Sequence, residues 1–202
     1  MRVFRSLKAA RKGGFCYSEP MITFITGNAG KYNEAVAVLG SIELSQQKLH
    51  LPEVQGLDPR EVLRAKLLAA KAEGVAPCIV EDSSLTLSCL NDQLPGPFIK
   101  WFEDALGIQG LYELTKKYED DRAIVHTHIG YLDEAGEMHL FDAKISGRIV
   151  LPRGDKDFGY GPIFLPDGSD KTFGEMERAE KQEISSRAMA FRALRDFLLA
   201  GS

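Results

Sequence analysis

Apolar stretches and helix-like patterns alternate along the chain after its first twenty residues. The apolar residues 21–25 predict a strand, and the pattern over residues 32–39 predicts a helix directly after it. Asp58 and Pro59 are residue types that favour an N-cap and a first helical position, so we expect a second helix that ends near residue 73. This order of elements is typical of an α/β protein.

A short apolar run over residues 76–80 predicts a buried strand with Glu81 and Asp82 at its carboxyl end. Open α/β sheets bind their ligands beyond the carboxyl ends of strands, so these two acids indicate a candidate site. Adjacent side chains on an extended segment point to opposite faces. We therefore expect Glu81 and Asp82 to have different roles.

The rest of the chain predicts two helices, a pair of strands and a final helix. These are helices 99–106 and 110–118, strands 123–132 and 138–150 joined as a hairpin around residues 133–136, and helix 184–199. The hairpin makes the sheet mixed. No linker, internal repeat or low-complexity stretch divides residues 21–202, which we expect to form a single α/β domain.

The turn between the first strand and helix reads Thr26-Gly-Asn-Ala-Gly-Lys31. Free N–H groups at a helix start and the positive end of the helix dipole attract anions, and the glycines let a ligand approach the backbone. The spacing matches neither G-x-x-x-x-G-K-[ST] nor G-x-G-x-x-G. The turn predicts a phosphate site of an uncommon type, although a plain turn with a solvated lysine has the same local pattern.

Composition restricts the class of protein. With 202 residues and 44% hydrophobic content the chain can bury a sizeable core, and no apolar run approaches the length of a membrane span. The net charge is −4, so a polyanionic substrate needs local lysines and a divalent metal to hold it. The three cysteines show no C-x-x-C spacing, which argues for a reducing compartment and against a disulfide framework or a structural zinc.

Residues 1–20 carry Arg2, Arg5, Lys8, Arg11 and Lys12 and no acid before Glu19. This basic extension resembles an organellar transit peptide. A disordered extension or a true start at Met21 explains the composition more readily. We expect a cytoplasmic protein, or a mitochondrial one if the extension is a transit peptide.

Hard oxygen ligands close to a phosphate site are typical of bound Mg²⁺. Glu53, Glu81 and Asp82 are the candidate metal ligands. One acid of the adjacent pair is suited to binding the metal while the other orders or deprotonates a water.

Several motifs give the chain a resemblance to the inosine triphosphate pyrophosphatase family, in its eukaryotic form. They are Thr26-Gly-Asn-Ala-Gly-Lys31, Leu51-Pro-Glu-Val-Gln-Gly56, Glu81-Asp-Ser-Ser-Leu85, Leu94-Pro-Gly-Pro-Phe-Ile-Lys-Trp-Phe102, Ser146-Gly-Arg-Ile-Val150, Asp157-Phe-Gly-Tyr160, Pro166-Asp-Gly168 and Ala179-Glu-Lys181. They follow one another from about residue 21 to the end of the chain. The resemblance implies one domain with two lobes around a mixed, elongated, twisted sheet flanked by helices.

The resemblance also implies hydrolysis of non-standard purine nucleoside triphosphates such as ITP, dITP and XTP to the monophosphate and pyrophosphate. The cofactor would be Mg²⁺, with Mn²⁺ as a substitute, and the protein would form a homodimer. Lys31 would hold the triphosphate, Glu53 would bind the metal, and Asp82 would act with metal and water. Water attack on a negatively charged phosphorus requires this kind of charge neutralisation. Lys66 is a candidate second phosphate lysine, although helical lysines are commonly solvated.

Base recognition would lie in the C-terminal half. Phe158 and Tyr160 would stack on the purine, and Lys181 and Arg187 would donate to its O6 oxygen. Adenine presents an amino donor there, and each unsatisfied buried donor costs roughly 1–3 kcal/mol. The further candidate substrate-binding residues are Thr26, Asn28, Gly159, Gly161, Ser185 and Ser186.

Two positions depart from the family pattern. The family usually has an aspartate where this chain has Gly161, and a histidine where it has Ser186. A carboxylate and an imidazole are thereby absent from these positions, while the phosphate and metal residues are unchanged. We expect altered or weakened base selectivity.

Two other classes of function are less consistent with the sequence. A catalytically weak homologue would bind nucleotides as a sensor or regulatory subunit, but the retained Lys31, Glu53 and Asp82 argue against it. Nucleic-acid binding through the basic extension is disfavoured because the rest of the chain is acidic and contains no recognised module.

Overall fold

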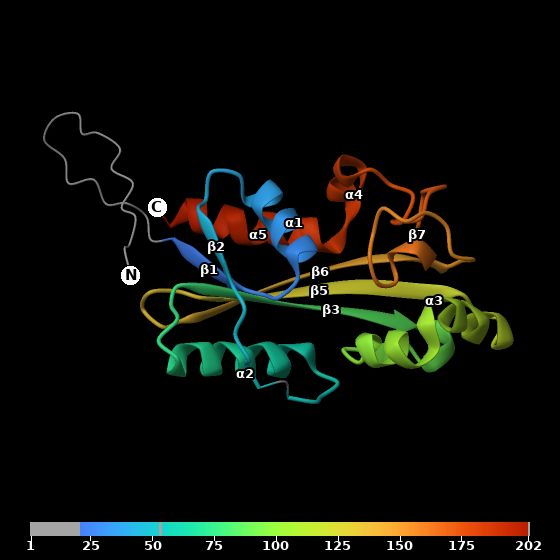
Figure 1. Cartoon of the computed structure of the whole chain (residues 1–202), viewed down its shortest axis with the longest axis horizontal. Coiled ribbons are helices and arrows are strands. Elements are labelled where there is room, and N and C mark those ends of the chain that lie inside the picture. The colour runs from blue at the N-terminus through green and yellow to red at the C-terminus, as the bar shows by residue number, and fades with distance from the viewer. Residues whose placement is uncertain (1–20, 53, 202) are drawn as a thin grey trace, which may run out of the picture.

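The computed structural model describes residues 21–52 and 54–201. The basic extension over residues 1–20 and the candidate metal ligand Glu53 therefore lie outside the described residues. Figure 1 shows an elongated molecule with a long central sheet.

The described residues form a seven-stranded mixed sheet of order β2-β1-β3-β5-β6-β7, with β4 paired to β3. The strands are β1 Ile22–Ile25, β2 Leu44–Gln47, β3 Cys78–Leu87, β4 Pro95–Gly96, β5 Arg122–Leu132, β6 Met138–Ile149 and β7 Phe164–Pro166. The helices are α1 Ala29–Leu39, α2 Pro59–Ala72, α3 Ile99–Lys117, α4 Arg178–Ile184 and α5 Ser186–Ala200, with 3-10 turns at Ser88–Leu90 and Gly161–Ile163. The predicted single α/β domain is confirmed.

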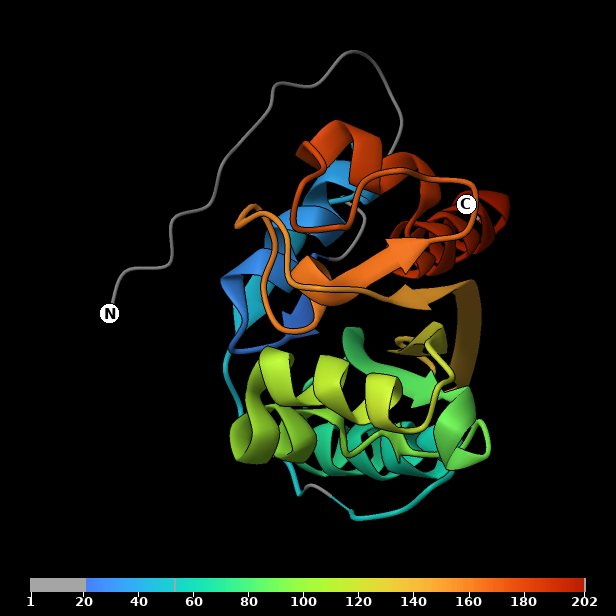
Figure 2. The same ribbon diagram turned by 90° about the vertical axis from the view of Figure 1, so that its right-hand side faces the viewer.

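Helices α1 and α5 cover one face of the sheet and α2 covers the other (Figure 1). Phe24 of β1 packs against Phe191 of α5 on one face, and Leu63 and Leu67 of α2 pack on the opposite face. A third cluster around Leu111 joins α3 to the far end of the sheet, where β7 lies. Figure 2 shows this end of the molecule facing the viewer, with α3 on one side and β7 on the other.

The predicted hairpin is confirmed, since β5 and β6 pair antiparallel across the turn at Asp133 and Gly136. The first helix begins at Ala29, three residues earlier than predicted, because Asn28 caps it. The two predicted helices, 99–106 and 110–118, are confirmed as two helical stretches of α3 that are separated by a non-helical kink at Gly107.

Three expectations differ from the structure. The strand predicted over residues 76–80 is too short, since pairing with β5 extends β3 to Leu87. The final helix, predicted over 184–199, is α5 and begins two residues later, whereas α4 before it was not predicted; Ser185, with a ψ of 144°, ends α4 and caps α5. Strands β2, β4 and β7 were not predicted, because β2 reads Leu-Ser-Gln-Gln without an apolar pattern and β4 and β7 have only two and three residues.

One consequence concerns Glu81 and Asp82, which lie in the middle of β3 and not at its carboxyl end. On the edge of β3 opposite to β5, β1 pairs at Cys78 and Ile79, and β4 pairs at Leu85 and Thr86. Among the described residues no strand covers this edge between those two pairings. The two acids therefore lie in a gap of the sheet, just beyond the end of β1.

No helix within the described part of the chain combines the length and apolar character needed to cross a bilayer.

Candidate functional site

A cavity of about 710 Å³ lies at this gap, within the range of small-molecule sites. It brings together all of the described residues that the sequence predicts for the site except Gly161. Its lining includes Thr26, Asn28, Lys31, Lys66, Glu81, Asp82, Phe158, Gly159, Tyr160, Lys181, Ser185, Ser186 and Arg187. These residues come from α1, α2, β3, α4, α5 and two loops, so the cavity joins segments far apart in the sequence.

The turn before α1 is closed by side chains of its own. Thr26 Oγ1 accepts a hydrogen bond from the N–H of Asn28 at 3.1 Å, and Asn28 Oδ1 accepts one from the N–H of Lys31 at 3.1 Å. The remaining first-turn N–H groups have no helical carbonyl to bond and form an anion site at the helix start. A Cβ at Gly30 would lie 2.7 Å from the ring of Phe158, so this glycine admits the aromatic side chain.

Glu81 and Asp82 point to opposite faces of β3, as predicted. Lys31 of α1 lies 3.4 Å from Glu81, and Lys66 of α2 lies 3.6 Å from Asp82. The Glu81 side chain is fully buried, whereas that of Asp82 is 21% exposed. Asp82 is thus the acid of the pair that keeps access to the cavity.

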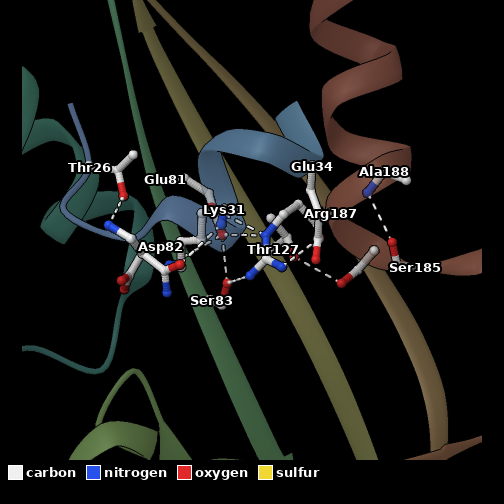
Figure 3. A network of polar contacts seen from close by, with 12 residues as sticks. Thr26, Lys31, Glu34, Glu81, Asp82, Ser83, Thr127, Ser185, Arg187 and Ala188 are labelled. Atoms are coloured by element: carbon white, nitrogen blue, oxygen red, sulfur yellow. Dashed lines mark hydrogen bonds and ion pairs between the residues drawn. The ribbon is translucent and has the colours of Figure 1, made fainter. Parts of the chain in front are cut away.

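Arg187 holds the buried side of the site together (Figure 3). Its Nε lies 3.2 Å from Glu81 Oε1, its Nη1 donates to Glu34 at 2.8 Å, and its Nη2 donates to the hydroxyl of Ser83 at 3.1 Å. Burial alone would raise the pKa of Glu81, but Arg187 and Lys31 outweigh burial and hold that pKa at about 2. The same balance lowers the pKa of Glu34, where burial is outweighed by Arg187 and Lys181.

Lys181 is enclosed by two acids and two rings. Its ammonium donates to Glu34 at 2.9 Å and to Asp157 at 2.7 Å, and it lies 5.5 Å from the ring centroids of Phe158 and Phe173. These cation–π contacts and ion pairs place a donor beside the aromatic side chain predicted to stack on a base.

Gly161 itself is buried and lies against the side chain of Asp157. A Cβ at position 161 would lie 2.4 Å from Asp157 Oδ2 and 2.7 Å from Asp157 Cβ. The space that a side chain at position 161 needs is occupied by the carboxylate of Asp157, which also holds Lys181. The site therefore contains a carboxylate here despite the glycine.

Ser185 and Ser186 begin α5. Ser185 caps the helix by accepting from the N–H of Ala188 at 3.2 Å, and the Ser186 hydroxyl lies 2.9 Å from that of Thr127 on β5. Both hydroxyls of the second pair are buried and partnered. Position 186 thus contributes a small hydroxyl to the cavity wall.

Tyr160 and Gly159 complete the loop. Burial raises the pKa of the Tyr160 phenol well above its ordinary value of 10.0, so the group stays a neutral donor. Gly159 has a φ of 58°, a left-handed conformation that favours glycine between the two aromatic residues.

Of the two candidate metal ligands that the structure describes, Glu81 and Asp82, Asp82 is the one suited to Mg²⁺. Magnesium is commonly held by one or two carboxylates with substrate phosphates and waters. Glu81 is committed to Lys31 and Arg187, and Glu53 lies outside the described residues. Asp82 has an accessible carboxylate next to the phosphate site, which fits this donor set.

Sequence reasoning missed five residues of the site. They are Glu34, Lys48, Glu103, Thr127 and Asp157. Lys48 follows β2, which was not predicted, and Asp157 stood in a quoted motif without a role. Glu34 lies one turn after Lys31 on α1, so helical spacing could have placed it on the same face.

Comparison with known proteins agrees with this geometry. The model of the Ham1 family matches residues 22–197. The chain is 38% identical over 192 residues to an inosine triphosphate pyrophosphatase of Scheffersomyces stipitis, covering 89% of this chain and 98% of that protein.

Two solved structures have the same fold. A HAM1 protein from Coxiella burnetii has a TM-score of 0.75 at 27% identity, covering 89% of this chain and 98% of that one. The Ham1 protein of Staphylococcus aureus also has a TM-score of 0.75, at 24% identity, covering 91% of this chain and 100% of that one.

Proposed function

Because the chain belongs to the Ham1 family, we propose that it hydrolyses nucleoside triphosphates with non-standard purine bases to the monophosphate and pyrophosphate. The observation that carries this proposal is the pairing of Lys31 with Glu81 and of Lys66 with Asp82 in the gap of the sheet, beside the first turn of α1. The two lysines and the helix start neutralise a triphosphate, and Asp82 remains accessible beside them.

The nucleotide would lie along the cavity with its phosphates at Thr26–Lys31 and its base at the Phe158–Tyr160 loop. Phe158 supports this orientation, because its ring contacts Gly30 at one end and lies over Lys181 at the other. A purine that reaches Lys181 places its O6 oxygen close to an ammonium donor. This direction favours bases with an oxygen at position 6 over adenine, which has an amino group there.

Asp82, together with the Glu53 predicted from the sequence, would hold Mg²⁺, with Mn²⁺ as a substitute. The ion, when bound, neutralises phosphate charge that the lysines alone do not balance. In the reaction, the oxygen of a water would form a bond to the α-phosphorus as the water gives a proton to the Asp82 carboxylate, the bond from that phosphorus to the bridging oxygen would break, and pyrophosphate would leave with the electron pair. Asp82 orients that water, and Lys66 holds the Asp82 carboxylate in place.

Lys31, Lys181 and Arg187 are all paired with acids in the structure. Substrate binding would therefore exchange partners at a nearly neutral site, and the enzyme would not rely on a strongly positive surface.

We also propose that the base selectivity differs from the usual family preference. Asp157 supplies the carboxylate that Gly161 lacks. The proposal therefore rests mainly on position 186, where the small Ser186 side chain pairs with the hydroxyl of Thr127. Two hydroxyls leave more room beside the base than a larger side chain would.

The test is pyrophosphate release from ITP, XTP, dITP, GTP, ATP and pyrimidine triphosphates, with and without Mg²⁺. We expect hydrolysis of ITP, dITP and XTP, and loss of activity when the metal is chelated. Asp82→Asn should lower kcat by about 10²-fold or more, because it removes the oriented carboxylate. Asp170→Asn, an exposed position outside the cavity, is the matched control.

Tight Mg²⁺-dependent nucleotide binding without pyrophosphate release, unchanged in Asp82→Asn, would contradict an enzyme. It would instead indicate a nucleotide sensor.

The homodimer is a further proposal. Trp101, Leu106 and Leu94 are exposed on and before α3, with Trp101 64% exposed, and together they offer apolar surface for an isologous contact. Sedimentation equilibrium of the protein and of Trp101→Lys tests it, and a monomeric wild type would exclude it.

A further inference from the structure

Lys48 is a cation of the cavity wall that the proposed reaction does not use. Of the five lysines in the described lining of the cavity, four are paired with acids. The pairs are Lys31 with Glu81, Lys66 with Asp82, Lys100 with Asp104, and Lys181 with Glu34 and Asp157. Lys48 has no hydrogen-bond or ion-pair partner among the residues that the structure describes. It is therefore the uncompensated lysine of the described lining.

The Lys48 side chain lies along the turn that precedes α1. Lys48 directly follows β2, whose last residue, Gln47, accepts a hydrogen bond from the N–H of Thr26 at 3.0 Å. The Cγ, Cδ and Cε atoms of Lys48 lie 3.5 to 3.6 Å from the point where a Cβ at Gly27 would be. The methylene stem thus packs on the backbone of the turn, and the ammonium at its end stays close to the turn.

The turn beside this stem offers further donors. The N–H groups of Gly27, Ala29 and Gly30 have no partner among the described residues. Free N–H groups at a helix start attract anions, and phosphate oxygens accept hydrogen bonds from them. Lys48 adds a positive charge to these groups on the side where β2 ends. This side of the turn therefore suits a phosphate.

The order of the strands indicates which phosphate lies at Lys48. Strand β1 lies between β2 and β3, and Asp82 lies on β3. Neighbouring strands are about 4.8 Å apart, so the end of β2 is roughly 10 Å from β3. In the proposed reaction Asp82 orients the water that attacks the α-phosphorus. The two further phosphates then continue past the end of β1 toward β2, and the last of them reaches Lys48.

We propose that Lys48 binds the terminal phosphate of the substrate and so determines the preference for nucleoside triphosphates over diphosphates. This inference deepens the proposed function and rests on it for the position of the α-phosphorus. A phosphate that binds Lys31 or Lys66 has to compete with the acid already paired with that lysine. Binding to Lys48 breaks no ion pair of the described chain, so the third phosphate gains a charge-assisted contact at little cost.

Lys48→Gln tests this role, because it removes the charge and keeps much of the stem. Calorimetry with ITP, IDP and IMP in metal-free buffer measures nucleotide binding without relying on the reaction. We expect the wild type to bind ITP more tightly than IDP. Lys48→Gln should bind ITP about ten-fold more weakly, because a charge-assisted hydrogen bond is lost. The affinities for IDP and IMP should not change, since neither has a third phosphate to place at Lys48.

The decisive quantity is the ratio of the dissociation constant of IDP to that of ITP. A residue that only supported the turn would weaken the binding of all three nucleotides together and leave this ratio unchanged, which would overturn the inference. Lys48→Arg restores the charge and should keep most of the preference for ITP. Lys117→Gln, at an exposed lysine of α3 outside the cavity, is the matched control and should leave every affinity unchanged.

Kinetics separates a failure of this inference from a failure of the proposed function. Lys48→Gln should raise KM for ITP more than it lowers kcat, because Asp82 and Lys66 are intact. If no pyrophosphate is released but the preference for ITP over IDP depends on Lys48, the proposed function fails and the inference stands. If pyrophosphate is released and Lys48→Gln leaves the ratio of dissociation constants unchanged, the inference alone fails.

Discussion

At the scale of single residues, Asp157 and Gly161 form a matched pair. The carboxylate of one fills the space that a side chain on the other would need, and it accepts from Lys181. A missing acid in a motif therefore does not mean a missing acid in the site. The sequence could show the glycine but not which neighbour takes its place.

Gly161→Asp should consequently not restore a family-like pocket. It would overpack the buried loop and place two carboxylates together, so we expect a loss of about 1–3 kcal/mol in unfolding free energy by denaturant titration. Adding Asp157→Gly should recover most of this loss, because it removes both the carboxylate and the Cβ that the new side chain would meet and leaves one acid for Lys181. Equal stability of Gly161→Asp and wild type would show that the loop yields more easily than the contacts indicate.

At the scale of elements, the strand-to-helix turn and the hairpin could be predicted from the sequence, since caps, glycines and alternation are local signals. That the two acids of β3 point to opposite faces could also be predicted, because side chains alternate along a strand. The extent of β3 could not. Glu81 to Ser84 are mostly polar, and only the non-local pairing with β5 keeps them in the strand.

The predicted cap of α2 offers a direct test at this scale. Asp58 accepts from the N–H of Arg60 at 2.9 Å, and Pro59 follows it. Asp58→Ala should lower the unfolding free energy by about 1 kcal/mol. Asp58→Asn should keep most of the stability that the cap contributes. Both variants should hydrolyse substrate normally, because Lys66 lies further along the helix. A change in kcat/KM with unchanged stability would show that the cap positions Lys66.

At the scale of the whole molecule, one network of ion pairs joins residues near the C-terminus to α1 and β3. Arg187 and Lys181, near the C-terminus, bind Glu34 on α1 and Glu81 on β3. The individual charges are visible in the sequence, but their mutual compensation depends on contacts between residues more than a hundred positions apart. This part of the site could not be read from local patterns.

Removal of Arg187 should reveal how much the fold depends on that network. Arg187→Met leaves Glu34 and Glu81 buried without their main partner, and we expect a loss of about 3–5 kcal/mol near neutral pH. Arg178→Met, at an exposed arginine, is the control and should change little.

For Arg187→Met we also predict that the loss of stability depends on pH. Glu34 and Glu81 have pKa values below their ordinary 4.5, that of Glu81 at about 2. Their stabilisation is present above pH 4.5 and is lost as pH falls toward 2, because the unfolded chain then takes up protons first. Thermal melts of wild type and Arg187→Met should therefore differ most above pH 4.5 and converge toward pH 2. A constant difference would place the effect in packing instead of charge.

The arrangement of β3 also limits how this protein can evolve. Because Glu81 and Asp82 serve opposite faces, a single-residue insertion or deletion upstream in the strand would exchange the partners of the two acids. Point substitutions can be tested one at a time by selection, but such a length change would disrupt both faces at once. Descendants of this chain should therefore vary in length at places such as the Asp133–Gly136 turn and keep the residue count between Cys78 and Asp82 unchanged.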